Sequence, residues 1–264
     1  MRFAVLTLIP VLALGLTAAR AASLPDTGQD KCYDGAAMVT CTIANTGDAA
    51  AYPRQDGRFG RDAKATTGTL GKIGGGAAGF DYSKIANNGS DLGAGVGLPL
   101  GNNPSEWACT RDNITGLVWE VKVNDSANPR HMNWIYTWYN SDGTTNGGNA
   151  GTPDTGGRTA DCLTALRCDT QKFVADVNAG ALCSYTDWRL PTQRELLTLV
   201  HRGMQGPSID TAYFPNTTAA PFWTGSPFVR ITASAWGVDF GGGFSGPDDK
   251  ANRVLVRLVR GPQF

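Results

Sequence analysis

The stretch "YTDWRLPTQRELLTLV", residues 185–200, predicts where a helix begins and how the chain enters it. Thr192 and Glu195 have the spacing of a capping box, in which each side chain accepts a hydrogen bond from the backbone amide of the other residue. The Leu190–Pro191 pair favours an extended approach, because a residue that precedes proline avoids the helical conformation. The stretch therefore predicts a sharply defined helix start at Thr192.

An aromatic residue and several apolar residues flank this helix start. Trp188 comes shortly after Cys183, and we expect it to pack in the core beside that cysteine. Leu196, Leu197 and Val200 follow at spacings that place them on the buried face of the helix. We interpret the stretch as scaffold rather than as a catalytic site.

The chain of 264 residues begins with a pattern typical of a secretory signal peptide. Arg2 precedes an apolar run at residues 3–16, which is shorter than the roughly 20 residues that a transmembrane helix needs. Residues 19–21, Ala-Arg-Ala, match a signal-peptidase site. We therefore predict that residues 1–21 are removed and that the protein is exported to the periplasm, the cell surface or the medium.

The charge of the mature chain argues against nucleic acid as a partner. Removal of residues 1–21 takes two arginines and no acidic residue from 23 basic and 23 acidic residues, which leaves a net charge of about −2. A nucleic-acid-binding protein usually carries a basic surface. No later segment of the sequence is long and apolar enough to span a membrane.

Six cysteines in an exported chain predict three disulfides, because the compartments outside the cytosol are oxidising. Six cysteines allow fifteen pairings, and the sequence does not decide among them. Short loops favour Cys32–Cys41 and Cys162–Cys168, which leaves Cys109–Cys183 as the third bond. A redox or metal site is the weaker alternative, because the chain has no Cys-x-x-Cys motif.

The mature chain divides into two parts by composition. Residues 22–105 are rich in Gly, Ala, Asp and Asn and show little periodicity, so we expect a loop-rich N-terminal region. We expect it to pack on the rest of the chain, because Phe59, Phe80 and Tyr82 need apolar partners. Residues 106–264 form the main domain.

The main domain alternates short strands with long loops and two helices. Asp169 or Thr170 begins the first predicted helix and Gly180 ends it, and the second is the helix that begins at Thr192. Alternating apolar residues predict five strands, within residues 112–122, 132–140, 221–227, 235–240 and 253–261. The domain is therefore of the α+β class, with short antiparallel sheets.

Seven short motifs occur in one order: "TGLVWEV", "YTWYN", "DWRLPTQREL", "IDTAYFPNT", "FWTGSP", "AWGVDF" and "VRLVRG". This series, which spans roughly residues 107–262, resembles the Lcl C-terminal domain family, named after a bacterial collagen-like adhesin. The stretches "LPDTGQDKCYD" and "RFGRDA" resemble the leader region that often precedes that domain.

The resemblance implies a fold similar to C-type lectins and formylglycine-generating enzymes. It also implies a surface or secreted protein that binds polysaccharides or other ligands; the named adhesin binds sulfated glycosaminoglycans. The shared motifs are mostly aromatic and apolar, so they indicate scaffold and carry over no binding residue.

An enzymatic function is not expected. The chain has only two histidines, His131 in a loop and His201 at a helix end, and both fit surface or capping roles. No hydrolase, zinc-protease or phosphate-loop motif is present. Formylglycine-generating enzymes need reactive cysteines late in the chain, and no cysteine follows Cys183. We therefore assign no catalytic residue.

No cofactor is expected, although calcium remains a possibility. Asp248, Asp249 and Asn252 lie close in sequence, and the loop at residues 140–146 offers further oxygens. Calcium needs six to eight such ligands, and the alternating acidic series of an EF-hand is absent. We assign no metal ligand.

Arginines near the C-terminus predict a surface for anionic ligands. Arg253 and Arg257, together with Arg260 and Arg230, would form a basic strip if all four were exposed. Guanidinium groups suit sulfates and carboxylates. The alternative is an ordinary solvated strand face with local ion pairs.

Two polar loops complete the expected ligand surface. The loop at residues 140–161, with Asp142 and Asn146, and the turns at residues 241–252 are long and polar, and loops on a rigid scaffold often bind ligands. Tryptophans that could stack on sugars stand nearby, although burial is the safer expectation for each: Trp119, Trp188 and Trp236 as core, and Trp134, Trp138 and Trp223 beside polar loops.

We thus expect an exported, non-catalytic binding protein that recognises a polysaccharide or another surface ligand. The alternative is a structural or interaction module of the bacterial cell envelope, with an envelope or surface protein as its partner.

Overall fold

The computed structural model describes residues 26–41, 55–156 and 160–263, so the predicted signal peptide lies outside the described residues. The helices are α2 (Asp56–Phe59), α3 (Arg61–Thr66), α4 (Thr170–Ala179) and α5 (Gln193–Leu197), with a 3-10 turn η1 (Leu182–Ser184). The strands are β1 (Lys31–Tyr33), β2 (Met38–Thr40), β3 (Tyr82–Ala86), β4 (Asp91–Gly93), β5 (Trp107–Asp112), β6 (Val118–Glu120), β7 (Ile135–Thr137), β8 (Pro221–Pro227), β9 (Ser234–Asp239), β10 (Phe244–Asp249), β11 (Arg253–Val256) and β12 (Val259–Arg260). The α+β class is confirmed.

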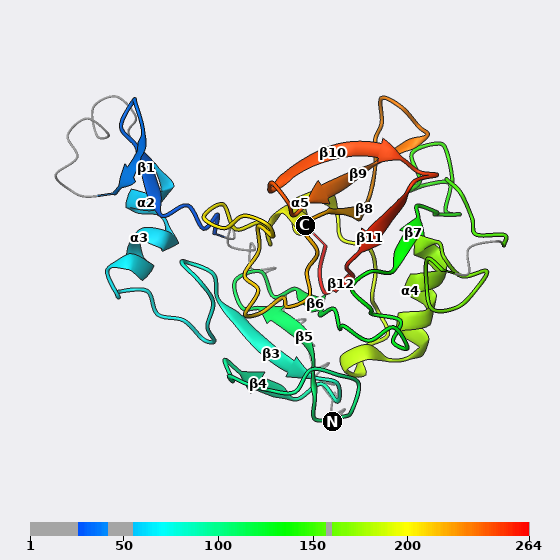
Figure 1. Cartoon of the computed structure of the whole chain (residues 1–264), viewed down its shortest axis with the longest axis horizontal. Helices are drawn as coiled ribbons and strands as arrows, with labels where there is room; N and C mark the ends of the chain where they lie inside the picture. The colour runs from blue at the N-terminus through cyan, green and yellow to red at the C-terminus, as the bar shows by residue number, and fades with distance from the viewer. Residues whose placement is uncertain (1–25, 42–54, 157–159, 264) are drawn as a thin grey trace, which may run out of the picture.

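Two five-stranded sheets form the body of the protein, and β1 and β2 form a separate hairpin beside α2 and α3 (Figure 1). One sheet has the order β10-β9-β8-β11-β7, and the other has the order β12-β6-β5-β3-β4. The expected antiparallel pairing holds for all neighbours except β8 and β11, which run parallel. No helix in the described part of the chain is long and apolar enough to cross a membrane.

Strands β8 and β11 are apolar on both faces because each face meets a different core. Val254 and Val256 of β11 enter one core together with Trp223, whereas Leu255 enters the other together with Phe222. Both cores also receive residues of the second sheet, so they join the two sheets. This arrangement buries residues on both sides of the central parts of β8 and β11.

The junction before α5 forms as its sequence predicts. The Thr192 hydroxyl accepts a hydrogen bond from the Glu195 amide at 3.1 Å, and the Glu195 carboxylate accepts one from the Thr192 amide at 2.8 Å. Trp188 is buried and donates from Nε1 to the Leu182 carbonyl. Leu196 and Val200 are buried, and Leu197 is half-buried.

An ion pair completes this junction. Arg189 donates through both terminal nitrogens to the two oxygens of Glu195, each at 2.8 Å, and Glu195 is fully buried. The backbone of Arg189 also exchanges two hydrogen bonds with Val259 of β12. The junction therefore links α5 to the C-terminal strand.

All three predicted disulfides are present, namely Cys32–Cys41, Cys109–Cys183 and Cys162–Cys168. The second joins β5 to η1 across 74 residues. The first predicted helix is α4, with Asp169 accepting from the Lys172 amide as its N-cap and Gly180 as its C-cap.

The expectation of a loop-rich region up to residue 105 is wrong for its second half. Strands β3 and β4 pair with β5, so the expected boundary at residues 105/106 falls inside a sheet. Every residue of β3 is buried, including Lys84, and the continuous burial removes the alternation that would reveal a strand. Phe80 and Tyr82 pack in the core as expected, whereas Phe59 is 66% exposed.

A buried ion pair stabilises the end of β6. The Lys122 ammonium lies 2.7 Å from Glu120, and both side chains are inaccessible to solvent. Burial lowers the pKa of Lys122 to about 8, and the Glu120 charge opposes that shift. The second Glu120 oxygen accepts from the Leu258 amide, so the pair also positions the chain between β11 and β12.

The junction predicts two different costs of mutation. We expect Trp188→Ala to lower the free energy of unfolding by about 3–5 kcal/mol, because it empties a core position. Thr192→Ala should cost about 1 kcal/mol, because one helix-start amide loses its acceptor. Denaturant unfolding measures both, with the half-exposed Trp236→Ala as the control. Parental stability of Trp188→Ala would contradict the structural role.

The buried pair predicts a larger effect than an exposed pair of the same type. Glu120→Gln should destabilise by about 3–5 kcal/mol, because it leaves the Lys122 ammonium buried without a counter-charge. The control is Asp91→Asn, which removes the partner of Arg111 at a site where the Asp91 side chain is 47% exposed. That change should cost about 0–1 kcal/mol. Equal costs in urea unfolding would show that the burial of the pair has no energetic consequence.

Candidate functional site

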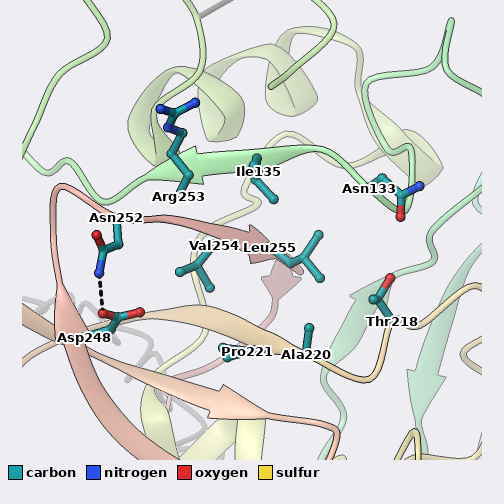
Figure 2. A pocket seen from close by; sticks show the side chains of 10 residues that line it. All are labelled: Asn133, Ile135, Thr218, Ala220, Pro221, Asp248, Asn252, Arg253, Val254 and Leu255. Atoms are coloured by element: carbon teal, nitrogen blue, oxygen red, sulfur yellow. Dashed lines mark hydrogen bonds between the residues drawn. The ribbon is translucent and has the colours of Figure 1, made fainter. Parts of the chain in front are cut away.

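A depression of about 550 Å³ lies where the parallel strands β8 and β11 begin (Figure 2). Its apolar lining comes from β7, β11 and the start of β8, and consists of Ile135, Ala220, Pro221, Val254 and Leu255. Its polar lining consists of Asn133, Thr218, Asp248, Asn252 and Arg253, which Figure 2 shows around the apolar residues. The combination offers an apolar surface with hydrogen-bonding groups at its edge.

Local hydrogen bonds fix the polar groups on one side of this depression. The Asn252 side chain donates to Asp248 Oδ1 at 2.7 Å, across the turn between β10 and β11 (Figure 2). Arg253 pairs with Asp161, and its side chain remains 48% exposed. Since Arg253 is half in solvent, it retains donors that can reach an additional anionic group.

A second, smaller depression adjoins the first. It shares Pro221, Asp248 and Val254 with the first, and its further lining includes Asp239 and Phe244. Phe244 is 59% exposed, which is unusual for a ring of this size. The two depressions together form an extended surface, which we call the β8–β11 groove.

Part of the polar loop, around residues 146–149, contacts the β10–β11 turn. Lys250 of that turn is buried and donates to the carbonyls of Asn146 and Asn149 at 2.9 and 2.7 Å. Its ammonium also lies 4.2 Å from the centre of the Trp138 ring. Burial lowers the pKa of Lys250. A buried lysine therefore stabilises the contact between the loop and the turn, and no sequence pattern indicates its role.

Two of the predicted ligand residues lie outside the β8–β11 groove. Asp142 accepts hydrogen bonds from the side chains of Thr144 and Thr145, and these contacts lower its pKa. Asn146 is buried, with its side chain bonded to Asn140 and Gly148 within the same loop. Both residues shape the loop, and a separate depression beside it is lined by Asn140 and Thr145.

The expectation that Arg257 contacts a ligand is wrong. Its side chain is fully buried, donates to the Glu120 carbonyl and the Thr217 hydroxyl, and lies over the rings of Phe214 and Phe222. Burial lowers its pKa to about 10. The alternation along this part of the chain is predicted correctly, but the side that carries Arg257 faces a core rather than solvent.

The remaining arginines do not form a strip. Arg260 pairs with Asp187 and lies 3.9 Å from the centre of the Tyr185 ring. Arg230 is exposed in the turn between β8 and β9. Of the four arginines considered in the sequence, only Arg253 lines the groove.

The tryptophans are mostly part of the core. Trp119, Trp138, Trp188 and Trp223 are buried, whereas Trp134 and Trp236 are half-buried. Trp236 was expected in the core, but it lies at the start of β9 against Phe228. No tryptophan in the described residues offers a fully exposed ring for stacking on a sugar.

The histidines are also enclosed. His201 is buried, accepts from the Gly203 amide and packs on Phe80, and burial lowers its pKa. His131 packs edge-on against Trp134. Neither histidine lines the β8–β11 groove.

Sequence reasoning missed half of the groove. Thr218 and Ala220 stand in a connecting segment, where no periodicity indicates which way a side chain faces, and Asn133 precedes β7 although the expected strand includes it. Residues 244–249 belong to the expected turns at residues 241–252, but they form strand β10, which brings Asp248 to the groove. Asp161 could have been recognised only through its contact with Arg253, 92 residues later.

Neither curated proteins nor solved structures give a match to this chain. The family model described as the Lcl C-terminal domain matches residues 108–260, which is more than half of the chain. The match begins within β5, so β3 and β4 extend the sheet beyond the part that the family model covers. The chain belongs to the Lcl C-terminal domain family.

Proposed function

We propose that this protein is an exported, non-catalytic binding protein that recognises an anionic polysaccharide in the β8–β11 groove. The observation that carries the proposal is the lining of the groove, an apolar surface edged by Asp248, Asn252 and Arg253. Sugar rings present both apolar C–H faces and hydroxyl groups, and binding sites commonly combine apolar walls with a few polar groups. The half-exposed Arg253 suits a sulfate or carboxylate on such a ligand.

Export supports this function. Three disulfides are typical of proteins from oxidising compartments, and the first residues have the pattern of a signal peptide. We further propose that the fold is C-type-lectin-like, in keeping with the two mixed-order sheets and long loops. The groove then lies on a rigid scaffold, and loops on such a scaffold often carry binding residues.

The absence of catalysis is part of the proposal. Glu120, a candidate acid in principle, is buried and engaged by Lys122 and the Leu258 amide. In the described part of the groove, Asp239 and Asp248 are the acidic residues, and no histidine or cysteine accompanies them. A nucleophile with an adjacent base is therefore not assembled among these lining residues.

An envelope interaction module is the second candidate, and one observation favours it. The turn between β8 and β9 exposes Val229 to 80% and Ile231 to 56%. Exposed apolar residues that lie close together often mark protein contacts. Such a contact would use the β8–β9 turn and leave the groove free.

The proposed function predicts that Arg253 contributes more to ligand affinity than Arg230. Arg253→Ala should weaken binding to a sulfated or uronic-acid polysaccharide roughly tenfold, because it removes charge-assisted hydrogen bonds. Arg230→Ala is the matched control, since it removes the same charge from the β8–β9 turn. A glycan array identifies the ligand, and titration calorimetry measures the affinities. Affinity should also fall with added salt, because exposed charges are screened over about 8 Å at physiological ionic strength.

Two results would contradict this assignment. Equal losses for Arg253→Ala and Arg230→Ala would indicate general charge attraction rather than a groove. Absence of binding to every polysaccharide, together with binding of an envelope protein that Val229→Ser abolishes, would favour the interaction module.

A further inference from the structure

Three carboxylates of the N-terminal region come together away from the β8–β11 groove. One oxygen from each of Asp26, Asp56 and Asp62 lies within 4.8 Å of the others. Asp26 stands before β1, Asp56 begins α2, and Asp62 lies in the first turn of α3. The three residues belong to the stretches "LPDTGQ" and "DGRFGRD", which are 30 residues apart in the sequence.

Two of these carboxylates are buried and incompletely paired. Asp62 is 1% exposed and Asp26 is 7% exposed, and Oδ2 of each is inaccessible to solvent and meets no hydrogen-bond donor among the described residues. Within the described part of the chain, Asp62 accepts at Oδ1 from the Gly79 amide at 2.8 Å. A buried ionised carboxylate without a partner is costly, so the cluster requires a neutralising group.

Backbone segments close around the same oxygens. A Cβ atom on Gly79 would lie 1.9 Å from Asp26 Oδ2, and one on Gly60 would lie 2.0 Å from Asp56 Oδ1. Only glycine permits the main chain to approach the carboxylates so closely at these two positions. The cluster is thus an enclosed set of oxygens rather than a loose acidic surface.

We propose that Asp26, Asp56 and Asp62 bind one calcium ion. Calcium is a hard cation that prefers carboxylate and carbonyl oxygens at 2.3–2.6 Å, so two oxygens on the same ion lie at most about 5 Å apart. The observed separation fits that limit. Three carboxylates supply enough negative charge for a divalent ion, with water and further oxygens completing its six to eight ligands. This site is distinct from Asp248 and Asn252, where the sequence left calcium open.

A proton is the competing explanation. Burial and the neighbouring Asp62 raise the pKa of Asp26 to about 8, so a proton shared between the two would also reduce the charge. A shared proton leaves Asp56 without a role in neutralisation, and it makes the cluster indifferent to calcium. The two explanations therefore differ in what calcium does to the protein.

The ion would stabilise the contact between the N-terminal region and the main domain. The Thr27 carbonyl accepts from the Arg202 amide at 2.8 Å, and Arg61 donates to the Gly79 carbonyl at 2.8 Å. Four segments of the chain, around residues 27, 61, 79 and 202, thus meet beside the three carboxylates. Calcium would stabilise this meeting point without contacting the β8–β11 groove.

Calcium titration of the mature protein tests the proposal. After treatment with a chelator, calorimetry should give about one calcium ion per chain, with a dissociation constant of about 10⁻³ M or tighter. Saturating calcium should raise the melting temperature by about 5 °C, because it binds only the folded protein. The same concentration of magnesium should raise it less, since magnesium requires a tighter octahedral geometry.

Matched variants assign the effect to the cluster. Asp56→Asn, at the half-buried member, should abolish the calcium-induced rise, and Asp62→Asn should do the same. Asp30→Asn, an exposed carboxylate in the same region, should retain it. Absence of any calcium-induced shift up to about 10 mM in the parent protein, or an undiminished shift in Asp56→Asn, would overturn the proposal. Stabilisation by Asp26→Asn without calcium dependence would identify the shared proton instead.

Discussion

The buried carboxylate of Glu195 is the constraint on which the rest of the structure depends. It accepts two hydrogen bonds from Arg189 and one from the Thr192 amide, and it has no exposed surface. Arg189 in turn pairs through its backbone with Val259 of β12, an edge of one sheet. A carboxylate that is buried must keep its partners, so Glu195 determines where α5 begins and where the last strand lies.

The presence of a separate core on each side of strands β8 and β11 explains why the family motifs form the scaffold of the fold. Strands β8 and β11 contribute alternate residues to both cores, so tryptophans and even an arginine of these motifs are enclosed. Surface chemistry is left to the strand ends and connecting loops. The β8–β11 groove lies at such an end, and the Asp26–Asp56–Asp62 cluster lies outside the matched domain.

Local features of the fold were predictable, and features that depend on distant partners were not. The capping box follows from spacing alone, short loops favoured the disulfide pairs without deciding them, and Asp169 was one of two possible caps; the structure contains the capping box, the Asp169 cap and the three disulfides. Strand β3 was not predicted because the burial of Lys84 removes the alternation of polar and apolar residues. Lys84 donates to the Gly95 carbonyl and lies over the Trp107 ring. The exposure of Arg257 was misjudged because it depends on a core built from strands far away in sequence. Of the four individually named ligand residues, only Arg253 lines the groove, where it is joined by Asp248 and Asn252 from the expected turns at residues 241–252.

A double-mutant cycle on Arg189 and Glu195 tests most directly that this junction holds the fold. Arg189→Met should lower the free energy of unfolding by about 3–5 kcal/mol, because it leaves a buried charge unpaired. Adding Glu195→Gln should recover part of that loss, which gives a coupling energy of about 2 kcal/mol or more. The same cycle on Arg260–Asp187, where the Asp187 side chain is 56% exposed, should give less than about 1 kcal/mol. Additive effects at Arg189 and Glu195, within about 0.5 kcal/mol, would contradict the account.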